Sequence, residues 1–148
     1  MNDLIYSVRY IFKNYLQKQH CSFFNIPEYQ RGYKWTADNV MQLLDDLKNF
    51  GNKRNGDEFY CLQNITVAKE TLKDSTCMNV IDGQQRLTTL MLLLRAFYEK
   101  YGSMKNDKAV KTSKFIEQCI WKTDEFGDPD KSALKIDSEV ATDKSSPA

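Results

Sequence analysis

The feature that most constrains this chain is a short apolar run that ends in an acid and a glycine and leads into a long amphipathic stretch. It reads Val80-Ile81-Asp82-Gly83-Gln84-Gln85-Arg86-Leu87-Thr88-Thr89-Leu90. A strand that delivers the chain to a tight turn at Gly83, followed at once by a helix, is the layout of a phosphate site. Glycine lets the backbone approach a ligand closely, and the first free N–H groups of a helix point at a bound anion.

Hydrophobic periodicity predicts helices on both sides of this segment. Apolar residues at helical spacing place the first helix over about residues 3–18, and the second runs from a cap at Thr36 to about Phe50. A third helix follows the motif, and a fourth spans about residues 108–121. The second helix is expected to bury Val40, Leu43, Leu44, Leu47 and Phe50. The third carries the apolar stripe Leu87, Leu90, Met91, Leu94, Phe97, Tyr98 and Tyr101.

Short strands are predicted between these helices. Residues 21–26 form the first, because Pro27 has no N–H to donate to a ladder and therefore ends it. Residues 59–68 and 78–81 are interpreted as a hairpin closed by a polar turn over residues 69–76. The pattern predicts an α/β (α+β) fold with a small mixed sheet flanked by helices.

The C-terminal part of the chain is expected to complete one domain and then become polar. Gly127-Asp128-Pro129 is a turn signal, and residues 134–136 can form a short strand. With 148 residues the chain is long enough for one domain with a real core. We expect this domain to span residues 1–136, with residues 137–148 as a polar tail or the start of a further region.

Composition excludes several function classes. The formal net charge is +1, from 21 basic and 20 acidic residues, so no global field draws the protein to nucleic acid or lipid. The cysteines form no C-x-x-C pair, which favours reduced thiols in a cytosolic protein over a zinc site. They are Cys21, Cys61, Cys77 and Cys119. No window has the length and apolar character of a membrane span.

A second polar cluster lies at a strand-to-helix junction in the first third of the chain. It reads Ile26-Pro27-Glu28-Tyr29-Gln30-Arg31-Gly32-Tyr33-Lys34-Trp35. Arg31 in this cluster and Arg86 in the first motif each carry a planar guanidinium that matches two anionic oxygens at once. Two such groups predict a clamp for a triphosphate.

The other polar side chains of the two motifs also suit nucleotide chemistry. Asp82 is the only carboxylate in the first motif, and a carboxylate beside phosphates can hold Mg²⁺ or orient the attacking water. Gln84 and Gln85 can donate to phosphate or position water, and the hydroxyls of Thr88 and Thr89 lie where phosphate oxygens would. Flat faces for a base or sugar are offered by Tyr29, Tyr33 and Trp35.

Structural interpretations stand beside these functional ones. Asp82 can be the N-cap of the following helix, with Gln85 reaching back in a capping box. The two threonines can be ordinary residues of the first helical turn. The aromatic residues of the second cluster can belong to the core or to an interface. Arg31 can form a structural ion pair with Asp38, Asp45 or Asp46.

Together the two motifs resemble the N-terminal domain of GmrSD-type, modification-dependent restriction endonucleases, which belongs to the ParB/sulfiredoxin-like superfamily. The resemblance extends from about Phe24 to Tyr101, with both motifs in the family's order, and includes residues 59–67, where the family has a strand. It implies an α/β domain with a ParB/sulfiredoxin-like core that binds a nucleoside triphosphate. In studied members the nucleotide is hydrolysed to control cleavage of modified foreign DNA.

The residues and the resemblance together give one set of site candidates. The catalytic candidates are Asp82, Gln84 and Gln85; the nucleotide and phosphate candidates are Gln30, Arg31, Gly83, Arg86, Thr88 and Thr89; the stacking candidates are Tyr29, Tyr33 and Trp35. Asp82 is also the expected ligand of a Mg²⁺ ion that accompanies the nucleotide. Gln63 stands where the family commonly has glycine, which bears on the local backbone geometry and on the approach to the ligand.

Two function classes follow. Family proteins often continue into a His-Asn-His nuclease domain, but His20 is the only histidine here, so we expect no DNA cleavage from this chain and an effector domain outside it. The first class is an NTP-binding and NTP-hydrolysing sensor domain of a bacterial, cytoplasmic restriction or phage-defence system. The second is a non-catalytic module that contacts DNA or docks partner proteins. Its phosphate contacts would come from Arg31, Lys34, Lys53 and Arg54.

Overall fold

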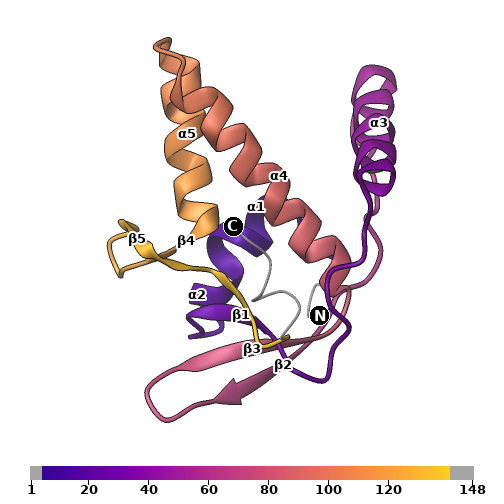
Figure 1. The fold of residues 1–148 in the computed structure, drawn as a ribbon. Coiled ribbons are helices and arrows are strands. Elements are labelled where there is room, and N and C mark those ends of the chain that lie inside the picture. The colour runs from indigo at the N-terminus through magenta and orange to yellow at the C-terminus, as the bar shows by residue number, and fades with distance from the viewer. Residues whose placement is uncertain (1–4, 141–148) are drawn as a thin grey trace.

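The computed structural model describes residues 5–140 of the chain. The elements are α1 (Val8–Tyr10), the π-helix η1 (Ile11–Tyr15), α2 (Leu16–Lys18), β1 (Phe23–Ile26), α3 (Ala37–Lys53), β2 (Thr66–Thr71), β3 (Thr76–Asp82), α4 (Gln84–Gly102), α5 (Asp107–Ile120), β4 (Trp121–Thr123), β5 (Pro129–Leu134) and β6 (Ile136–Ser138). Figure 1 shows α4 and α5 rising from the sheet side by side, with α3 projecting separately from the other side of the molecule. The predicted α+β class is confirmed.

The main sheet has the strand order β2-β3-β1-β6. β1 runs parallel to both of its neighbours, with Phe23 opposite Cys77 on β3 and Phe24 opposite Ile136 on β6. Parallel neighbours need long crossover connections, which α3 supplies before the β2–β3 hairpin and α4 with α5 supply before β6. The mixed sheet therefore places the end of β3 and the start of α4 beside the chain that leaves β1.

The core lies between the sheet and the helices that cover it. Phe24 and Val80 on the central strands are almost fully buried, and Leu87 of α4 and Ile120 of α5 pack with them. The predicted stripe of α4 is confirmed in its first half, where Leu87, Leu90 and Met91 are buried. Farther along, Phe97 is exposed, because the C-terminal half of α4 packs chiefly against α5 and rises above the sheet.

The first helix begins later than predicted. The helical stretch starts at Val8, because the Ser7 hydroxyl caps it by accepting a hydrogen bond from the Tyr10 N–H at 3.1 Å. Residues 3–4 of the predicted helix lie outside the described residues. Its centre is a π-helix, where the buried Lys135 ammonium donates to the Phe12 carbonyl at 2.9 Å and also to the Gln118 carbonyl of α5. One buried cation therefore joins the first helix to the end of α5.

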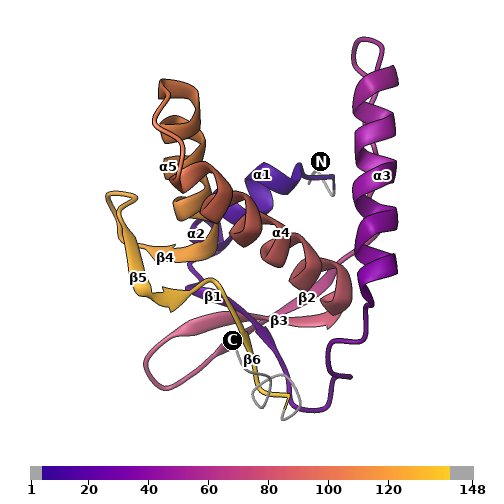
Figure 2. The same cartoon turned by 45° about the horizontal axis from the view of Figure 1, so that its top comes forward.

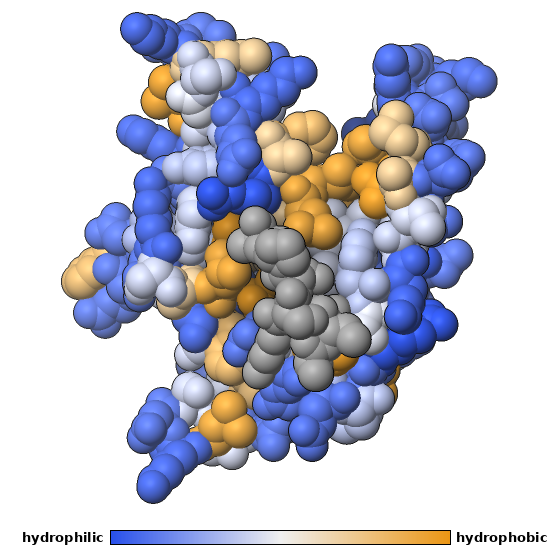
Figure 3. Space-filling view, viewed as in Figure 1, coloured by the Kyte–Doolittle hydropathy of each residue, from blue (hydrophilic) through white to orange (hydrophobic). Residues whose placement is uncertain are grey.

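The predicted cap of α3 is confirmed, but its predicted buried face is only partly so. Thr36 caps the helix in a capping box with Asn39. Leu43 is buried, whereas Leu44 and Leu47 are half-buried and line an open apolar groove against Leu90 and Leu94 of α4. Figure 2 shows α3 standing apart from the helices over the sheet, and Figure 3 shows apolar surface gathered in the hollow between α3 and α4.

The predicted hairpin is present, but its first strand was wrongly placed. Residues 59–65 form no strand, β2 spans Thr66–Thr71, and the turn is shorter, with the Leu72 N–H donating to the Ser75 carbonyl at 2.7 Å. The apolar alternation of the earlier residues reflects a loop whose Leu62 and Ile65 pack against the core. β2 itself is a mostly exposed edge strand, so hydrophobic alternation does not mark it.

The strand predicted at residues 134–136 is wrong, because β5 ends at Leu134 and a separate strand, β6, begins at Ile136. Gly127, with φ of 85°, makes the predicted turn between β4 and β5, a pair that the sequence did not predict. The last strand is Ile136–Ser138, with Asp137 and Ser138 paired to β1, and Val140 is buried beyond it. Residues 141–148 of the predicted tail lie outside the described residues. Within residues 5–140, no helix has the length and apolar character needed to cross a bilayer.

Candidate functional site

A pocket of about 670 Å³ opens where β3 ends and α4 begins. Its lining consists of Arg31, Trp35, Gln63, Asn64, Asp82, Gly83, Gln84, Gln85 and Arg86. The pocket thus joins the two motifs predicted from the sequence with a third segment from the loop before β2. A crevice outside the carboxyl end of a strand, next to the start of a helix, is the usual place for ligands in open α/β sheets.

Gly83 is the residue that shapes the floor of this pocket. Its φ is 90°, a left-handed conformation that favours glycine, and a Cβ placed there would lie 3.0 Å from Ile65 Cγ1 and 3.2 Å from the Asn64 carbonyl oxygen. Gly83 is also the N-cap of α4, with no side chain capping the helix. The first N–H groups of α4, which have no partner within the helix, are therefore left for a ligand.

The capping-box interpretation of Asp82 is wrong. The Asp82 carboxylate accepts the N–H of Gly83 at 3.0 Å, and neither it nor Gln85 caps α4. Instead, the Gln85 amide crosses to the second motif: its Nε2 donates to the Gly32 carbonyl at 2.9 Å, and its Oε1 accepts the Lys34 N–H at 2.7 Å. Both ends of this amide are therefore occupied, and Gln85 holds the loop of the second motif against α4. Its catalytic role stays a prediction.

Several other predicted ligands also serve to hold the site together. Gln30 Nε2 donates to the carbonyls of Ile81 at 2.9 Å and Val80 at 3.3 Å. The fully buried Thr89 hydroxyl donates to the Gln85 carbonyl at 2.7 Å and lies 2.8 Å from the Tyr33 hydroxyl. These contacts fasten the second motif to β3 and α4, and Gln30, Tyr33 and Thr89 lie outside the pocket lining. Tyr29 and Thr88 also lie outside the pocket lining.

Arg31 and Arg86 remain as the cationic side chains of the pocket. Arg86 Nη2 donates to the neutral Gln63 Oε1 at 2.9 Å. Within residues 5–140, the ion pairs are Arg95 with Glu99 and Lys131 with Glu117, so the predicted structural pairing of Arg31 with an acid of α3 is not seen. Both pocket guanidiniums therefore keep their positive charge without an acidic partner.

Gln63 and Asn64 were not predicted as site residues. Gln63 has φ of 75°, in the left-handed region that favours glycine. Here the glutamine side chain holds Arg86 at the pocket wall. In the sequence, Gln63 stood out only as a departure from the glycine of the resembling family. That departure indicated an unusual backbone conformation, but it did not indicate the contact with Arg86.

The side chains of the pocket can bind Mg²⁺ only if a bound ligand supplies further oxygen atoms. Asp82 is the one carboxylate that lines the pocket, and the described part of the chain holds no group of three or more metal-ligating side chains. Mg²⁺ is commonly held by one or two carboxylates together with phosphate oxygens and water. The residues therefore fit a metal that arrives with a polyphosphate, and they do not build a closed metal cage.

The basic residues expected to contact DNA do not form one patch. Arg31 and Lys34 precede α3, whereas Lys53 and Arg54 lie at its far end. A helix of this length separates the two pairs by about 25 Å, at about 1.5 Å per residue. Only the first pair lies near the pocket.

Comparison with known proteins agrees with the two motifs. A family model described as "GmrSD restriction endonuclease, N-terminal domain" matches residues 8–146. The match includes all the residues that line the pocket. No curated protein matches the chain.

Proposed function

The chain belongs to the family of GmrSD restriction endonuclease N-terminal domains, and we propose that its pocket binds a nucleoside triphosphate together with Mg²⁺. The observation that carries this proposal is the meeting of two guanidiniums without acidic partners and an uncapped helix start in one pocket. Each of these features attracts an anion, and together they suit a ligand with several phosphate groups.

Each part of the pocket has a defined role in this proposal. The Gly83 turn and the first N–H groups of α4 bind phosphate oxygens. The guanidinium groups of Arg31 and Arg86 donate further hydrogen bonds to these oxygens. Asp82 would hold Mg²⁺, and the metal would supply positive charge for phosphoryl transfer. Trp35 offers its indole to the sugar or base.

Hydrolysis is the second half of the proposal. Gln84 lines the pocket, and Gln85 is occupied by the second motif, so Gln84 is the amide we assign to orienting the attacking water. Nucleotide turnover would then control a restriction or phage-defence system whose DNA contacts and cleavage belong to other parts of the full-length protein. We include the ParB/sulfiredoxin-like relationship in the proposal, which the small mixed sheet supports.

The competing class, a DNA-contacting module, lacks a comparable observation, because its basic residues are divided between the two ends of α3. Salt dependence separates the two classes. Binding of DNA through these residues should weaken steeply with salt, whereas nucleotide binding in the pocket should not require DNA.

Isothermal titration calorimetry tests the binding half. We expect heat on addition of tripolyphosphate or a nucleoside triphosphate with Mg²⁺, and a loss of this heat in Arg86→Ala. Release of inorganic phosphate, measured with wild type and Gln84→Ala, tests the catalytic half. Absence of binding for every triphosphate and for tripolyphosphate would refute the proposal, whereas binding without phosphate release would refute hydrolysis alone.

A further inference from the structure

Arg31 lies on an irregular segment that neighbouring side chains hold in place. Residues 31–36, between β1 and α3, form neither helix nor strand. Arg31 itself is exposed and lines the pocket. A cation on a freely moving loop would have to be ordered each time a phosphate bound, and this ordering would weaken binding. The contacts that fasten the segment therefore affect how well Arg31 can bind an anion.

Hydrogen bonds attach this segment to the rest of the domain on both sides of Arg31. Before it, the Gln30 amide donates to carbonyls at the end of β3, the closer at 2.9 Å. After it, Gln85 of α4 accepts the Lys34 N–H at 2.7 Å and donates to the carbonyl of the buried Gly32 at 2.9 Å. Arg31 therefore lies between two attachments, one to the strand and one to the helix that meet at the pocket.

The side chain of Gln85 suits this attachment by its chemistry and its place. A neutral amide carries both a donor and an acceptor, so it can bind the Gly32 carbonyl and the Lys34 N–H at once, whereas a carboxylate has no donor and an ammonium has no acceptor. Consecutive residues of a helix point about 100° apart, so Gln85 can face the segment while Arg86 faces Gln63 across the pocket. Gln85 also borders the pocket, but both ends of its amide are occupied by the segment.

We propose that Gln85 is a positioning residue that holds Arg31 where its guanidinium meets the phosphates, an inference that rests on the proposed function. The Gln85 amide does not bind phosphate, and its effect on affinity acts through Arg31. Arg86 does not depend on this amide, because it lies on α4 itself and is held by Gln63. Gln85 and Arg31 therefore act on anion binding as one unit, and Gln85 and Arg86 act independently.

Gln85→Met tests this inference, because methionine keeps the length of the side chain and removes both hydrogen bonds. By calorimetry with tripolyphosphate and Mg²⁺, we expect the affinity to fall about 10-fold, since Arg31 must then be ordered at each binding event. Gln118→Met is the matched control. It also removes a hydrogen bond from an amide to a backbone carbonyl, that of Gly127, but on α5 and outside the pocket lining. It should leave the affinity unchanged.

Double-mutant cycles separate positioning from a direct or a merely structural role. In the Arg31→Ala background, Gln85→Met should cause no further loss of affinity, whereas in the Arg86→Ala background it should still cause a loss of about 10-fold. Low ionic strength strengthens binding, so that the weakened variants stay measurable. A weakened fold, or direct contact of Gln85 with phosphate, would lower the affinity in both backgrounds alike. Equal losses in both would therefore overturn the inference and leave the proposed function intact.

Trypsin gives a second readout that needs no ligand. It cleaves after Arg31 and Lys34 only when the segment opens locally, so Gln85→Met should speed cleavage at these sites, identified by mass spectrometry, and Gln118→Met should not. Unchanged cleavage in Gln85→Met, or unchanged affinity for tripolyphosphate, would overturn the inference alone. If wild type binds neither tripolyphosphate nor any nucleoside triphosphate, the proposed function itself fails, and the inference fails with it.

Discussion

Arg86 and Arg95 lie on the same helix, α4, in opposite surroundings. Arg95 is about half exposed but has partners on the protein surface: its Nε donates to Glu99 at 3.1 Å, and its guanidinium lies 5.7 Å from the centre of the Tyr98 ring and 5.4 Å from that of Trp121. Arg86 faces the pocket and donates to a neutral amide. The middle of α4 therefore carries an arginine with an acidic partner, and its first turn carries one without.

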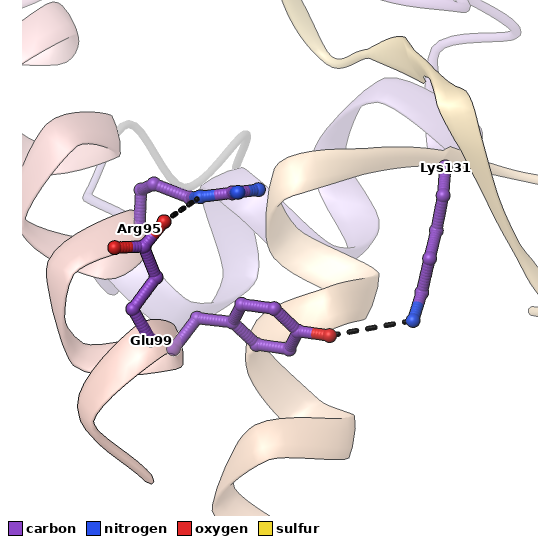
Figure 4. A network of polar contacts seen from close by, with 4 residues as sticks. Arg95, Glu99 and Lys131 are labelled. Atoms are coloured by element: carbon purple, nitrogen blue, oxygen red, sulfur yellow. Dashed lines mark hydrogen bonds and ion pairs between the residues drawn. The ribbon is translucent and has the colours of Figure 1, made fainter. Parts of the chain in front are cut away.

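The neighbours of Arg95 make further ionic and hydrogen-bonding contacts. Lys131 lies 3.0 Å from Glu117 and donates to the Tyr98 hydroxyl at 3.3 Å. Figure 4 shows this contact to the hydroxyl beside the Arg95–Glu99 pair. Burial raises the pKa of Glu117, but the hydrogen bonds from Lys131 and Tyr98 outweigh it and leave that pKa below its ordinary value. The contrast teaches that α4 pairs one of its arginines with an acid and leaves the other, at the pocket, without an acidic partner.

Removing each arginine in turn is the strongest test of this comparison. Arg86→Ala should weaken binding of tripolyphosphate with Mg²⁺ roughly 100-fold, because a charge-assisted contact to phosphate is worth about 2–3 kcal/mol. Arg95→Ala removes the same charge from the same helix and should leave the affinity unchanged. Calorimetry of both variants measures the difference, and equal losses would show that only the overall charge matters.

The next test alters the backbone at the pocket. Gly83→Ala should lower the free energy of unfolding by about 2 kcal/mol, from the left-handed φ and the close approach to Ile65. Gly102→Ala is the control at the other end of α4, where a Cβ would meet nothing within 4 Å; it should be neutral or stabilising by up to about 1 kcal/mol. Urea denaturation compares them. A neutral Gly83→Ala would contradict the assigned geometry.

Lys135 gives a pH-dependent test away from the pocket, in the core between the first helix and α5. Burial lowers the pKa of this ammonium from 10.5 to about 8. Below pH 8 both states are protonated and the fold bears the cost of a buried charge; above it the folded state loses the proton before the unfolded state does. Stability should therefore rise by about 1 kcal/mol from pH 8 to pH 9. Denaturation at both pH values should show this rise in wild type and a smaller one in Lys135→Met.

The smallest effect is expected for the exposed part of the network. Lys131→Ala should lower the free energy of unfolding only slightly, by much less than Gly83→Ala does, because a half-exposed ion pair contributes little in water. Thermal unfolding in low and high salt measures it. A loss as large as that of Gly83→Ala would mean that the contacts around Arg95 depend on the Lys131–Glu117 ion pair more than on aromatic packing.

The sequence predicted the local turns and caps of the site better than the contacts between its two motifs. The strand–turn–helix at Gly83 and the cap at Thr36 follow from local chemistry, and the structure confirms both. The roles of Gln85 and Thr89 could not be predicted, because they depend on hydrogen bonds to residues more than 50 positions away. Residue type indicated a polar site, but only the fold separates the side chains that line the pocket from those that hold it in place.

Dependence on distant contacts also explains most of the wrong predictions about the fold. The edge strand β2 is mostly polar and exposed, so its position depends on pairing with β3 and not on its own hydrophobic pattern. The late start of the first helix depends on one cap, Ser7, within a pattern that is apolar on both sides of it. The buried Lys135, which joins two helices through their carbonyls, had no signal in a sequence rich in lysine.

The central claim is that a triphosphate binds at the start of α4. Two-dimensional ¹H–¹⁵N NMR of the ¹⁵N-labelled chain, titrated with tripolyphosphate and Mg²⁺, tests it most directly. We predict saturable shifts that are largest for the amides of Gly83, Gln84 and Gln85, with little change around Arg95. Saturable shifts confined to other parts of the chain, or no shifts at millimolar tripolyphosphate, would contradict it.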